Sequence, residues 1–393
     1  MFFRETLIFP SGGSSNYRIP SIIATNDGTI LAFCSDRKDT LADYADRVAL
    51  VLCRKAPNGD WGKVESILEH DGWSCNIGSA VYDEERGTAF IFASRTALTC
   101  KEFGNYTEEE LADLRRRAQE KAEREGIRAG SVLMKSADSG QTWTEVPYRV
   151  THTDYTHYDG RVLRTGGSTH GSSHGIRLRH GAHQGRLLCP SRFGVDRYTD
   201  LEGLKYNTYN NAVYSDDHGE TWHSTKPVQM GTGEGTLIER ADGSILYNSR
   251  AYYKDGKRYL ATSRDGGESW GDFTTDEFLR EELRMGCNAS FLRVELGDIR
   301  DRTALPADAE DVTVFCNPRA DTRDNMCACV SFDGGSTWRH VKQIFPGHAA
   351  YSSLCFSPAN QRFYLLYEKG EKNCYSDGVA VAEFDLEWLL AGN

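Results

Sequence analysis

Short apolar segments that alternate with polar turns dominate the hydrophobic pattern of the whole chain. In 21–35, two apolar runs flank Asn-Asp-Gly, and 79–94, 237–250 and 354–368 repeat the order of strand, polar turn with Gly or Asn, and strand. Such turns between apolar runs are strong hairpin signals. The segment 48–54 (VALVLCR) is apolar enough to be a buried strand. The pattern therefore predicts an all-β fold built from antiparallel hairpins.

One eight-residue phrase occurs in four copies: SADSGQTW (136–143), SDDHGETW (215–222), SRDGGESW (263–270) and SFDGGSTW (331–338). Asp can accept bonds from its own downstream N–H groups and Gly permits positive φ, so S-x-D-x-G predicts a tight turn. The Trp that ends each copy favours an extended, half-buried strand. Four unrelated surface hairpins are the alternative, but such similar octapeptides favour a repeat architecture. The motif NGDW at 58–61 resembles a degenerate further copy.

Hairpins spread evenly along a chain are typical of a β-propeller, in which four-stranded sheets surround an axis. At roughly 60 residues per blade, the 393 residues predict six blades. The sequence contains no Pro/Ser-rich or low-complexity linker. We therefore expect residues 1–393 to form a single propeller domain.

The segment 107–127 breaks the strand pattern and predicts a helix. Thr107 and Glu110 form a capping box, and acidic residues fill the first turn. One apolar stripe contains Leu111, Leu114, Ala118 and Ala122. We expect an insertion lying on one face of the propeller with this stripe packed on the body. A partner subunit is the alternative cover for the stripe, and the sequence does not define the oligomeric state.

Composition narrows the environment and the partners. A net charge of −11 argues against nucleic acid and anionic membrane surfaces as partners. No apolar run reaches the roughly 18 residues that a membrane span needs, and MFFRETLIFP lacks the features of a signal peptide. The 11 cysteines show no regular framework, which suits reduced thiols. We therefore expect a cytoplasmic protein, the alternative being a secreted form whose signal has been removed.

Two motifs together with the Asp-turn phrase resemble the sialidase (neuraminidase) family and its Asp-box (BNR) repeats. They are NYRIPSII at 16–23 and LAFCSDR at 31–37, and the resemblance runs to FDLEWL at 384–389, which resembles the closing strand of that family. Its members are six-bladed propellers of the glycoside hydrolase class, and they cleave terminal sialic acids with retention of configuration. The resemblance therefore implies a retaining exo-α-sialidase that acts on sialylated glycans without a cofactor.

The substrate of such an enzyme bears a carboxylate on its anomeric carbon, and Arg binds a planar carboxylate in bidentate fashion. The resemblance implies three clamp residues: Arg18 in R-I-P, Arg250 at the end of ILYNSR, and Arg323 before the last Asp turn. It also implies that Glu368 braces Arg18. A single Arg is usually a surface salt bridge, but three at three motif positions favour a clamp.

The substrate carboxylate would repel a carboxylate nucleophile, and sialidases use Tyr instead. A free Tyr has a pKa of about 10, so it needs a base beside it. The resemblance implies Tyr351 as nucleophile and Glu234 as its base; a core tyrosine and a loop carboxylate are the alternatives. It implies Asp43, six residues after Arg37, as the acid/base that protonates the leaving oxygen and later activates water. Asp46 is the second choice for that role.

Further positions concern substrate identity. Arg37 and Asn76 match family positions near the carboxylate and near the substituent on carbon 5. Ile77 stands where the family has Pro, and Arg192 stands where several relatives present tyrosines to the glycerol tail. Arg192 suggests a more polar tail pocket. Kdn, the de-aminated sialic acid, or another ulosonic acid is therefore an alternative to N-acetylneuraminic acid.

Other functions fit the sequence less well. His170 and His174 in THGSSHG lie four apart in a Gly/Ser loop, whereas metal ligation needs rigid, convergent ligands, so we expect no metal. A non-catalytic glycan-binding propeller would be expected to lack some of the motif residues. A trans-sialidase, intermolecular or intramolecular, would have the same site, and only its products would distinguish it.

Overall fold

The computed structural model describes residues 1–41, 47–97, 107–157, 159–167, 169, 173–195, 200–201, 204–205 and 208–392. Within these ranges strands dominate, and the α-helices are α1 (Glu108–Glu125) and α2 (Leu386–Leu390). Short 3-10 turns occur at η1 (Gly181–His183) and η2 (Leu296–Asp298). The prediction of an all-β fold is confirmed.

Four sheets, in which most strand pairs are antiparallel, follow one another along the chain. The first contains β2 (Tyr17–Ala24), β3 (Ile30–Asp36), β4 (Ala49–Lys55) and β5 (Trp61–Leu68). The second contains β6 (Ser74–Asp83), β7 (Thr88–Thr96), β8 (Gly130–Ser136) and β9 (Thr144–Val146). The third contains β10 (Val150–Thr151), β13 (Ile176–Arg177), β14 (Leu187–Gly194), β17 (Thr208–Ser215) and β18 (Trp222–Ser224). The fourth contains β19 (Thr232–Glu239), β20 (Ile245–Ala251), β21 (Lys257–Ser263) and β22 (Gly271–Arg280).

The remaining strands form one seven-stranded sheet in the order β1-β28-β27-β26-β25-β24-β23. Their bounds are β1 (Phe3–Pro10), β23 (Ser290–Glu295), β24 (Asp311–Pro318), β25 (Asp324–Ser331), β26 (His340–Ser357), β27 (Arg362–Gly370) and β28 (Gly378–Phe384). Residues 340–348 of β26 pair with β25, and residues 348–357 pair with β27. Two small hairpins are β11 (Asp154–Thr156) with β12 (Val162–Arg164) and β15 (Asp200–Leu201) with β16 (Leu204–Lys205).

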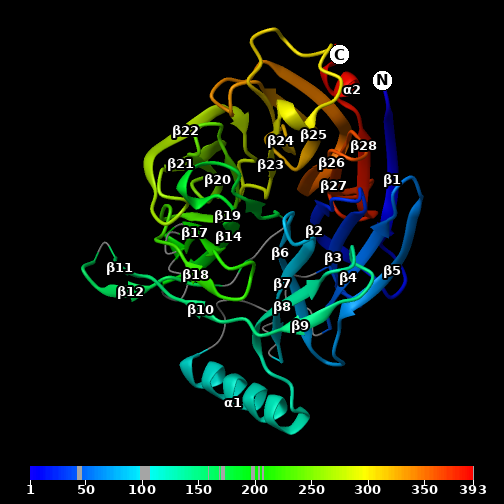
Figure 1. Ribbon diagram of the computed structural model, residues 1–393. Helices are drawn as coiled ribbons and strands as arrows, with labels where there is room; N and C mark the ends of the chain where they lie inside the picture. The colour runs from blue at the N-terminus through cyan, green and yellow to red at the C-terminus, as the bar shows by residue number, and fades with distance from the viewer. Residues whose placement is uncertain are drawn as a thin grey trace.

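The sheets surround a common axis, as the succession of colours in Figure 1 shows. Apolar clusters fill the spaces between neighbouring sheets: Phe33 packs with Ile91 between the first and second sheets. The ring is closed by β1, the first strand, which pairs antiparallel with β28, the last. The arrangement is that of a β-propeller.

The four Asp turns are built as predicted. Asp138 accepts hydrogen bonds from the Thr142 N–H at 2.9 Å and from the Ser136 hydroxyl at 2.8 Å. Asp217, Asp265 and Asp333 accept the same pair of bonds in the other copies. These bonds outweigh burial and lower the pKa of Asp138 to about 2. The turns join β8 to β9, β17 to β18, β21 to β22 and β25 to β26.

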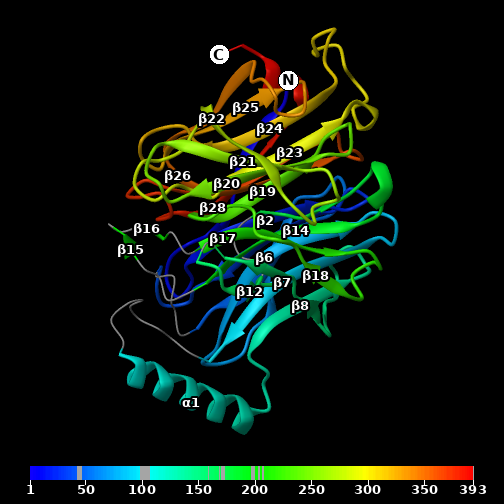
Figure 2. The same cartoon turned by 90° about the vertical axis from the view of Figure 1, so that its left-hand side faces the viewer.

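Helix α1 forms as predicted, with the capping box between Thr107 and Glu110 present. Its position differs from the expectation: Figures 1 and 2 both place α1 outside the ring, at the rim, and not over a face. The C-terminal end of α1 is attached to the propeller. Glu125 accepts a 2.7 Å hydrogen bond from the Trp73 indole, and Ala122 packs against the apolar cluster that contains Trp73. The other stripe residues, Leu111, Leu114 and Ala118, are only half-buried.

The expected closing strand at 384–389 is wrong. Strand β28 ends at Phe384, and residues 386–390 form helix α2. Asp385 explains the change, because its carboxylate accepts a 2.8 Å bond from the Trp388 N–H and caps the helix. The strand that completes this edge of the sheet is β1.

Two general properties concern the described residues only. Their ten cysteines form no disulfide, and nine of them are buried. No helix among them is long and apolar enough to cross a membrane.

Candidate active site

Side chains from three sheets converge around Tyr351 on β26. The Tyr351 hydroxyl donates to Glu234 Oε1 on β19 at 3.0 Å. One guanidinium nitrogen of Arg250, on β20, donates to both Tyr351 Oη and Glu234 Oε2. All three residues are buried, each with 6% exposure. Tyrosine, carboxylate and guanidinium thus form one hydrogen-bonded triad.

The charges around this triad set its protonation state. Burial alone would raise the pKa of Glu234, but the positive charges of Arg250 and Arg192 and bonds from Arg250 and Tyr351 outweigh it and lower the pKa to about 2. Burial also raises the pKa of Tyr351, and this effect outweighs the opposing charge of Arg250. The shared proton therefore resides on Tyr351, and Glu234 is an ionised acceptor. That state suits a base that waits to take a proton from a hydroxyl nucleophile.

Three arginines surround the Tyr351 ring. The guanidinium carbons of Arg18, Arg250 and Arg323 lie 5.4, 5.6 and 5.3 Å from the ring centroid. Arg18 lies on β2, Arg250 on β20, and Arg323 directly before β25. The structure therefore brings together the three arginines that the sequence motifs selected.

Glu368 on β27 is the acceptor that fixes Arg18. Its carboxylate accepts from Arg18 Nε at 2.9 Å and from Arg18 Nη2 at 3.2 Å, and its exposure is 0%. It also accepts from the N–H of Ile19 at 2.9 Å and from the N–H of Tyr351 at 3.3 Å. One buried carboxylate thus holds the backbone of two site strands. Ile19 has φ 63°, a strained value for a β-branched residue, beside the predicted clamp.

Four strands bulge at the level of this site. The register shifts between Arg18 and Ser21 in β2, Ile77 and Ala80 in β6, Thr232 and Gly235 in β19, and Ala349 and Ser352 in β26. Strand β2 lies beside β6 and β26, because the Ser21 hydroxyl accepts from the Ala80 N–H and the Ser353 hydroxyl from the Ile22 N–H. Glu234 and Tyr351 lie within the bulges of β19 and β26. A bulge re-aims side chains and interrupts pairing, which turns these two residues into the site.

The other predicted substrate residues lie at different distances from the triad. Arg192 on β14 is part of it, because its Nη1 lies 3.5 Å from Glu234 Oε1. Arg37 is buried after β3 and donates to the Leu41 carbonyl at 2.8 Å. Asn76 on β6 is half-buried and donates to the Ser74 hydroxyl at 2.8 Å. The roles of all three remain predictions.

The predicted acid/base, Asp43, and its alternative, Asp46, lie outside the described residues. The described chain stops at Leu41, whose carbonyl accepts from Arg37, and resumes at Arg47. His170 also lies outside, whereas His174 is buried, and burial lowers its pKa to about 4. Among the described residues no three His, Cys, Asp or Glu side chains form a group that could hold a metal.

Two site features were missed by sequence reasoning. Tyr375, in the turn between β27 and β28, lies with its ring 4.4 Å from the Arg18 guanidinium. The carbonyls of Met285 and Gly286 accept from Arg250 Nε at 2.9 Å and Arg323 Nη2 at 3.0 Å. Of these residues only Gly286 carries a sequence signal, because a glycine is favoured where φ is positive, and its φ is +69°. The sequence cannot reveal what such a turn contacts.

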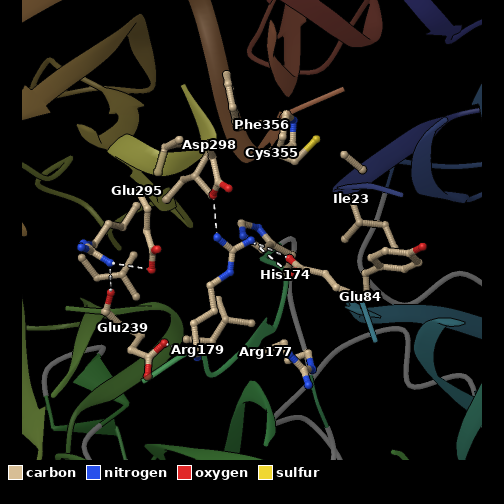
Figure 3. A pocket seen from close by; sticks show the side chains of 18 of the residues that line it. Ile23, Glu84, His174, Arg177, Arg179, Glu239, Glu295, Asp298, Cys355 and Phe356 are labelled. Atoms are coloured by element: carbon tan, nitrogen blue, oxygen red, sulfur yellow. Dashed lines mark hydrogen bonds and ion pairs between the residues drawn. The ribbon is translucent and has the colours of Figure 1, made fainter. Parts of the chain in front are cut away.

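A cavity of about 350 Å³ lies at the opposite ends of the same strands, lined by Ile23, Glu239, Cys355 and Phe356 among others. Arg18 and Ile23 are five residues apart on β2, which is roughly 16 Å of extended chain. Figure 3 shows Arg179 inside this cavity, bonded to Glu84 and Asp298. None of the residues predicted for catalysis lines it.

Comparisons with known proteins bear on the fold and on the family of the chain. The family model described as "BNR repeat-like domain" matches residues 116–361. A sialidase of Micromonospora viridifaciens is 31% identical over 384 residues, covering 96% of this chain and 52% of its own length. The structure of the Hadza microbial sialidase Hz136 has a TM-score of 0.70 at 22% identity and covers 95% of this chain and 66% of its own. The Ruminococcus gnavus intramolecular trans-sialidase, solved with oseltamivir carboxylate, has a TM-score of 0.70 at 15% identity and covers 98% of each chain.

The chain therefore belongs to the family of BNR-repeat-like propellers, since the model spans more than half of it. Within that family it is a propeller of the sialidase type, as the sequence resemblance predicted. The chain spans 52%, 55% and 64% of the first three curated relatives that it matches.

Proposed function

We propose that this propeller is a retaining exo-α-sialidase, a glycoside hydrolase that removes terminal sialic acids from glycans. The observation that supports the proposal most directly is the 3.0 Å bond from Tyr351 to Glu234 with three arginines around the Tyr351 ring. A guanidinium cluster fits a carboxylated sugar, and a tyrosine avoids the repulsion that a carboxylate nucleophile would meet. Sialidase names among the curated relatives support the same assignment.

In the first step, Tyr351 Oη attacks the anomeric carbon while its proton moves to Glu234. The bond from that carbon to the leaving glycan oxygen breaks, and Asp43 gives its proton to this oxygen. Arg18, Arg250 and Arg323 hold the sugar carboxylate. Because Glu234 is ionised in the free protein, it can accept the proton without prior rearrangement.

In the second step, water attacks the same carbon and Asp43 takes one of its protons. The bond from Tyr351 to the sugar breaks, and Tyr351 recovers its proton from Glu234. Two inversions at one carbon give overall retention. The proposed chemistry uses side chains alone and involves no cofactor.

We also propose that the propeller has six blades. Besides the four sheets of four or five strands, the seven-stranded sheet divides at β26, whose first half pairs with β25 and whose second half pairs with β27. One blade would then be β23 to the first half of β26. The other would be the second half of β26 with β27, β28 and β1. A crystal structure in which β25 and β27 belong to one blade would contradict this division.

The test is release of 4-methylumbelliferone from paired substrates that bear N-acetylneuraminic acid or Kdn. We expect release by the wild type and a loss of at least about a thousandfold in Tyr351→Phe. Tyr364→Phe is the matched control, because Tyr364 is also a buried tyrosine and lies on the neighbouring strand β27. The ratio of the two rates identifies the preferred sugar.

The products separate the alternative functions. Proton NMR of the first product reports whether the α-anomer is released, as retention requires. Transfer of the sialic acid to an added acceptor would indicate an intermolecular trans-sialidase. Formation of an anhydro sugar, into which no water has been incorporated, would indicate an intramolecular one. Binding without turnover by the wild type would instead indicate a glycan-binding propeller.

A further inference from the structure

The segment 281–287, which connects β22 to β23, contacts two of the three arginines through backbone carbonyls. Met285 O accepts from Arg250 Nε, and Gly286 O accepts from Arg323 Nη2, at 2.9 and 3.0 Å. Successive carbonyls of one turn thus orient two guanidinium groups that come from different sheets. A carbonyl is a neutral acceptor, so it orients a guanidinium and leaves its positive charge available to an anion.

Glu281 and Arg258 hold this turn from the side away from Tyr351. Arg258 Nη1 donates to Glu281 Oε2 and, at 2.9 Å, to the Cys287 carbonyl. Glu281 Oε1 accepts from the Cys287 N–H at 2.6 Å. Both polar groups of the Cys287 backbone are therefore fixed by one ion pair. The exposure of the two side chains is 0% for Arg258 and 3% for Glu281.

The turn leaves little room for other arrangements. A Cβ at position 286 would lie 2.9 Å from Arg250 Cγ and 3.0 Å from the Ala251 carbonyl. Cys287 packs against Tyr351 and Ala350. Glu282 accepts from the N–H groups of Arg284 and Met285 at 2.8 and 3.1 Å. The carbonyls can therefore move only if the turn as a whole moves.

We propose that Arg258 and Glu281 are positioning residues of the carboxylate clamp, acting through the 281–287 turn on Arg250 and Arg323. The proposal rests on the proposed sialidase function. A buried ion pair is weak evidence for a gain in stability, because desolvation offsets the attraction. It holds the backbone of Cys287, one residue after Gly286 and two after Met285, whose carbonyls orient the arginines, and this position indicates a role in geometry.

The test compares Glu281→Gln, Arg258→Met and the double variant Arg258→Met/Glu281→Met with the wild type. We expect KM to rise about tenfold with kcat within about threefold, because a displaced clamp weakens substrate and transition state alike. The pH profile should keep its shape, since the variants keep the charges of Arg250 and Arg192 that lower the pKa of Glu234. Replacing both charges by apolar groups of similar volume restores stability in many proteins. In the double variant, recovered thermal stability with a KM still raised about tenfold would therefore separate geometry from stability.

The matched control is the ion pair of Arg293 and Asp311, which joins β23 to β24 with a 2.7 Å bond and side-chain exposures of 7% and 2%. Arg293→Met/Asp311→Met should leave KM within twofold of the wild type. A KM within twofold in folded Glu281 and Arg258 variants would overturn the proposal. An equal rise in KM in the control pair would also overturn it.

A binding measurement tests the clamp without turnover. Calorimetry with 2,3-didehydro-2-deoxy-N-acetylneuraminic acid should show the same tenfold loss of affinity, whereas its methyl ester, which lacks the anion, should show none. An equal loss for acid and ester would contradict the role in carboxylate binding. A wild type that neither hydrolyses substrate nor binds the acid would instead refute the proposed function itself.

Discussion

Arginines gather at both ends of the strands that surround the axis, but the groups that bind them differ between the two ends. At the cavity end, Arg179 bonds to Asp298 and Glu84, and Arg293 bonds to Asp311. At the Tyr351 end, Arg250 and Arg323 each donate one bond to a backbone carbonyl. Both ends therefore gather arginines, but each of these cavity-end arginines pairs with two carboxylates, Arg293 also with Glu295, whereas at the Tyr351 end Arg250 and Arg192 share the one carboxylate of Glu234.

This difference explains how one fold can place charge for two purposes. Arg179 joins Glu84 beside β6 to Asp298 in η2, so its charge cross-links separate sheets and is neutralised there. At the Tyr351 end, the few carboxylates have specific tasks: Glu368 orients Arg18, and Glu234 bonds Tyr351. Carbonyls supply part of the remaining orientation without cancelling charge. An anion binds where guanidinium groups are oriented but incompletely neutralised.

The largest expected effect comes from changing one arginine at each end. Arg250→Lys should lower kcat/KM by on the order of a hundredfold to a thousandfold, because lysine cannot keep the geometry of a bidentate guanidinium. Arg179→Lys should leave kcat/KM within about twofold. Hydrolysis of the 4-methylumbelliferyl substrate and thermal unfolding measure both properties. Similar losses of activity in the two variants would erase the distinction between the ends.

The second effect concerns, at each end, a buried carboxylate that accepts hydrogen bonds from an arginine. Glu368→Gln leaves the Arg18 charge without its anion, so the free energy of unfolding should fall by about 3 kcal/mol, with a large loss of activity. Asp311→Asn is its counterpart, because Asp311 accepts from Arg293, Thr313 and Gly334. We expect a comparable loss of stability in denaturant melts but unchanged kcat/KM. Retained activity in Glu368→Gln would show that Arg18 needs no anionic support.

A third, smaller effect is a shift in pH dependence. Arg192 is one of the charges that hold the pKa of Glu234 at about 2. Arg192→Met should raise that pKa by roughly one unit or less, so Glu234 would be protonated at higher pH and the acid limb of kcat/KM would move upward. Arg192→Lys keeps the charge and should keep the limb closer to its original position. Profiles of kcat/KM between pH 3 and 7 measure the position of this acid limb. A downward shift of the limb in Arg192→Met would contradict the effect of the Arg192 charge on the pKa of Glu234.

The smallest effect is expected at the Asp turn that joins β8 to β9. Asp138→Ala should lower the free energy of unfolding by about 1 kcal/mol at pH 7, since the carboxylate is largely exposed and screened. The native pKa is depressed to about 2. This contribution is therefore complete above the unfolded pKa of about 4 and is lost as the pH falls toward 2. Urea melts at pH 7 and pH 2.5 measure the difference, which should shrink at the lower pH, while activity stays unchanged.

Sequence alone predicted the features that depend on local chemistry. The Asp turns and the hairpins follow from short-range hydrogen bonding, so 21–35 and 237–250 form the β2–β3 and β19–β20 hairpins as expected. The capping box of α1 is equally local. The convergence of Arg18, Glu234 and Tyr351 was predicted only through motif resemblance, because these residues are far apart in the chain.

The features that sequence missed depend on contacts between distant segments. The bulges in β2, β6, β19 and β26 depend on register with neighbouring strands; Pro20, Gly78 and Gly233 lie in three of them, but such residues do not reveal which side chains a bulge brings together. The rim position of α1 depends on Trp73, which is remote in sequence. At 384–389 a local signal was available, since Asp385 is a good N-cap, but the prediction followed the resemblance to the closing strand of the family. The described residues leave the position of Asp43 as a prediction.

The pairing of β1 with β28 has a consequence for synthesis of the protein. Strand β1 is made before β28, which follows it by more than 360 residues. At about 5 to 20 residues per second, β1 waits roughly 20 to 70 s for its partner. During that time it is an unpaired strand, which can pair with other chains. Arg4, Glu5 and Thr6 give the first half of β1 polar side chains, and side chains of this kind disfavour such pairing while the ring is still open.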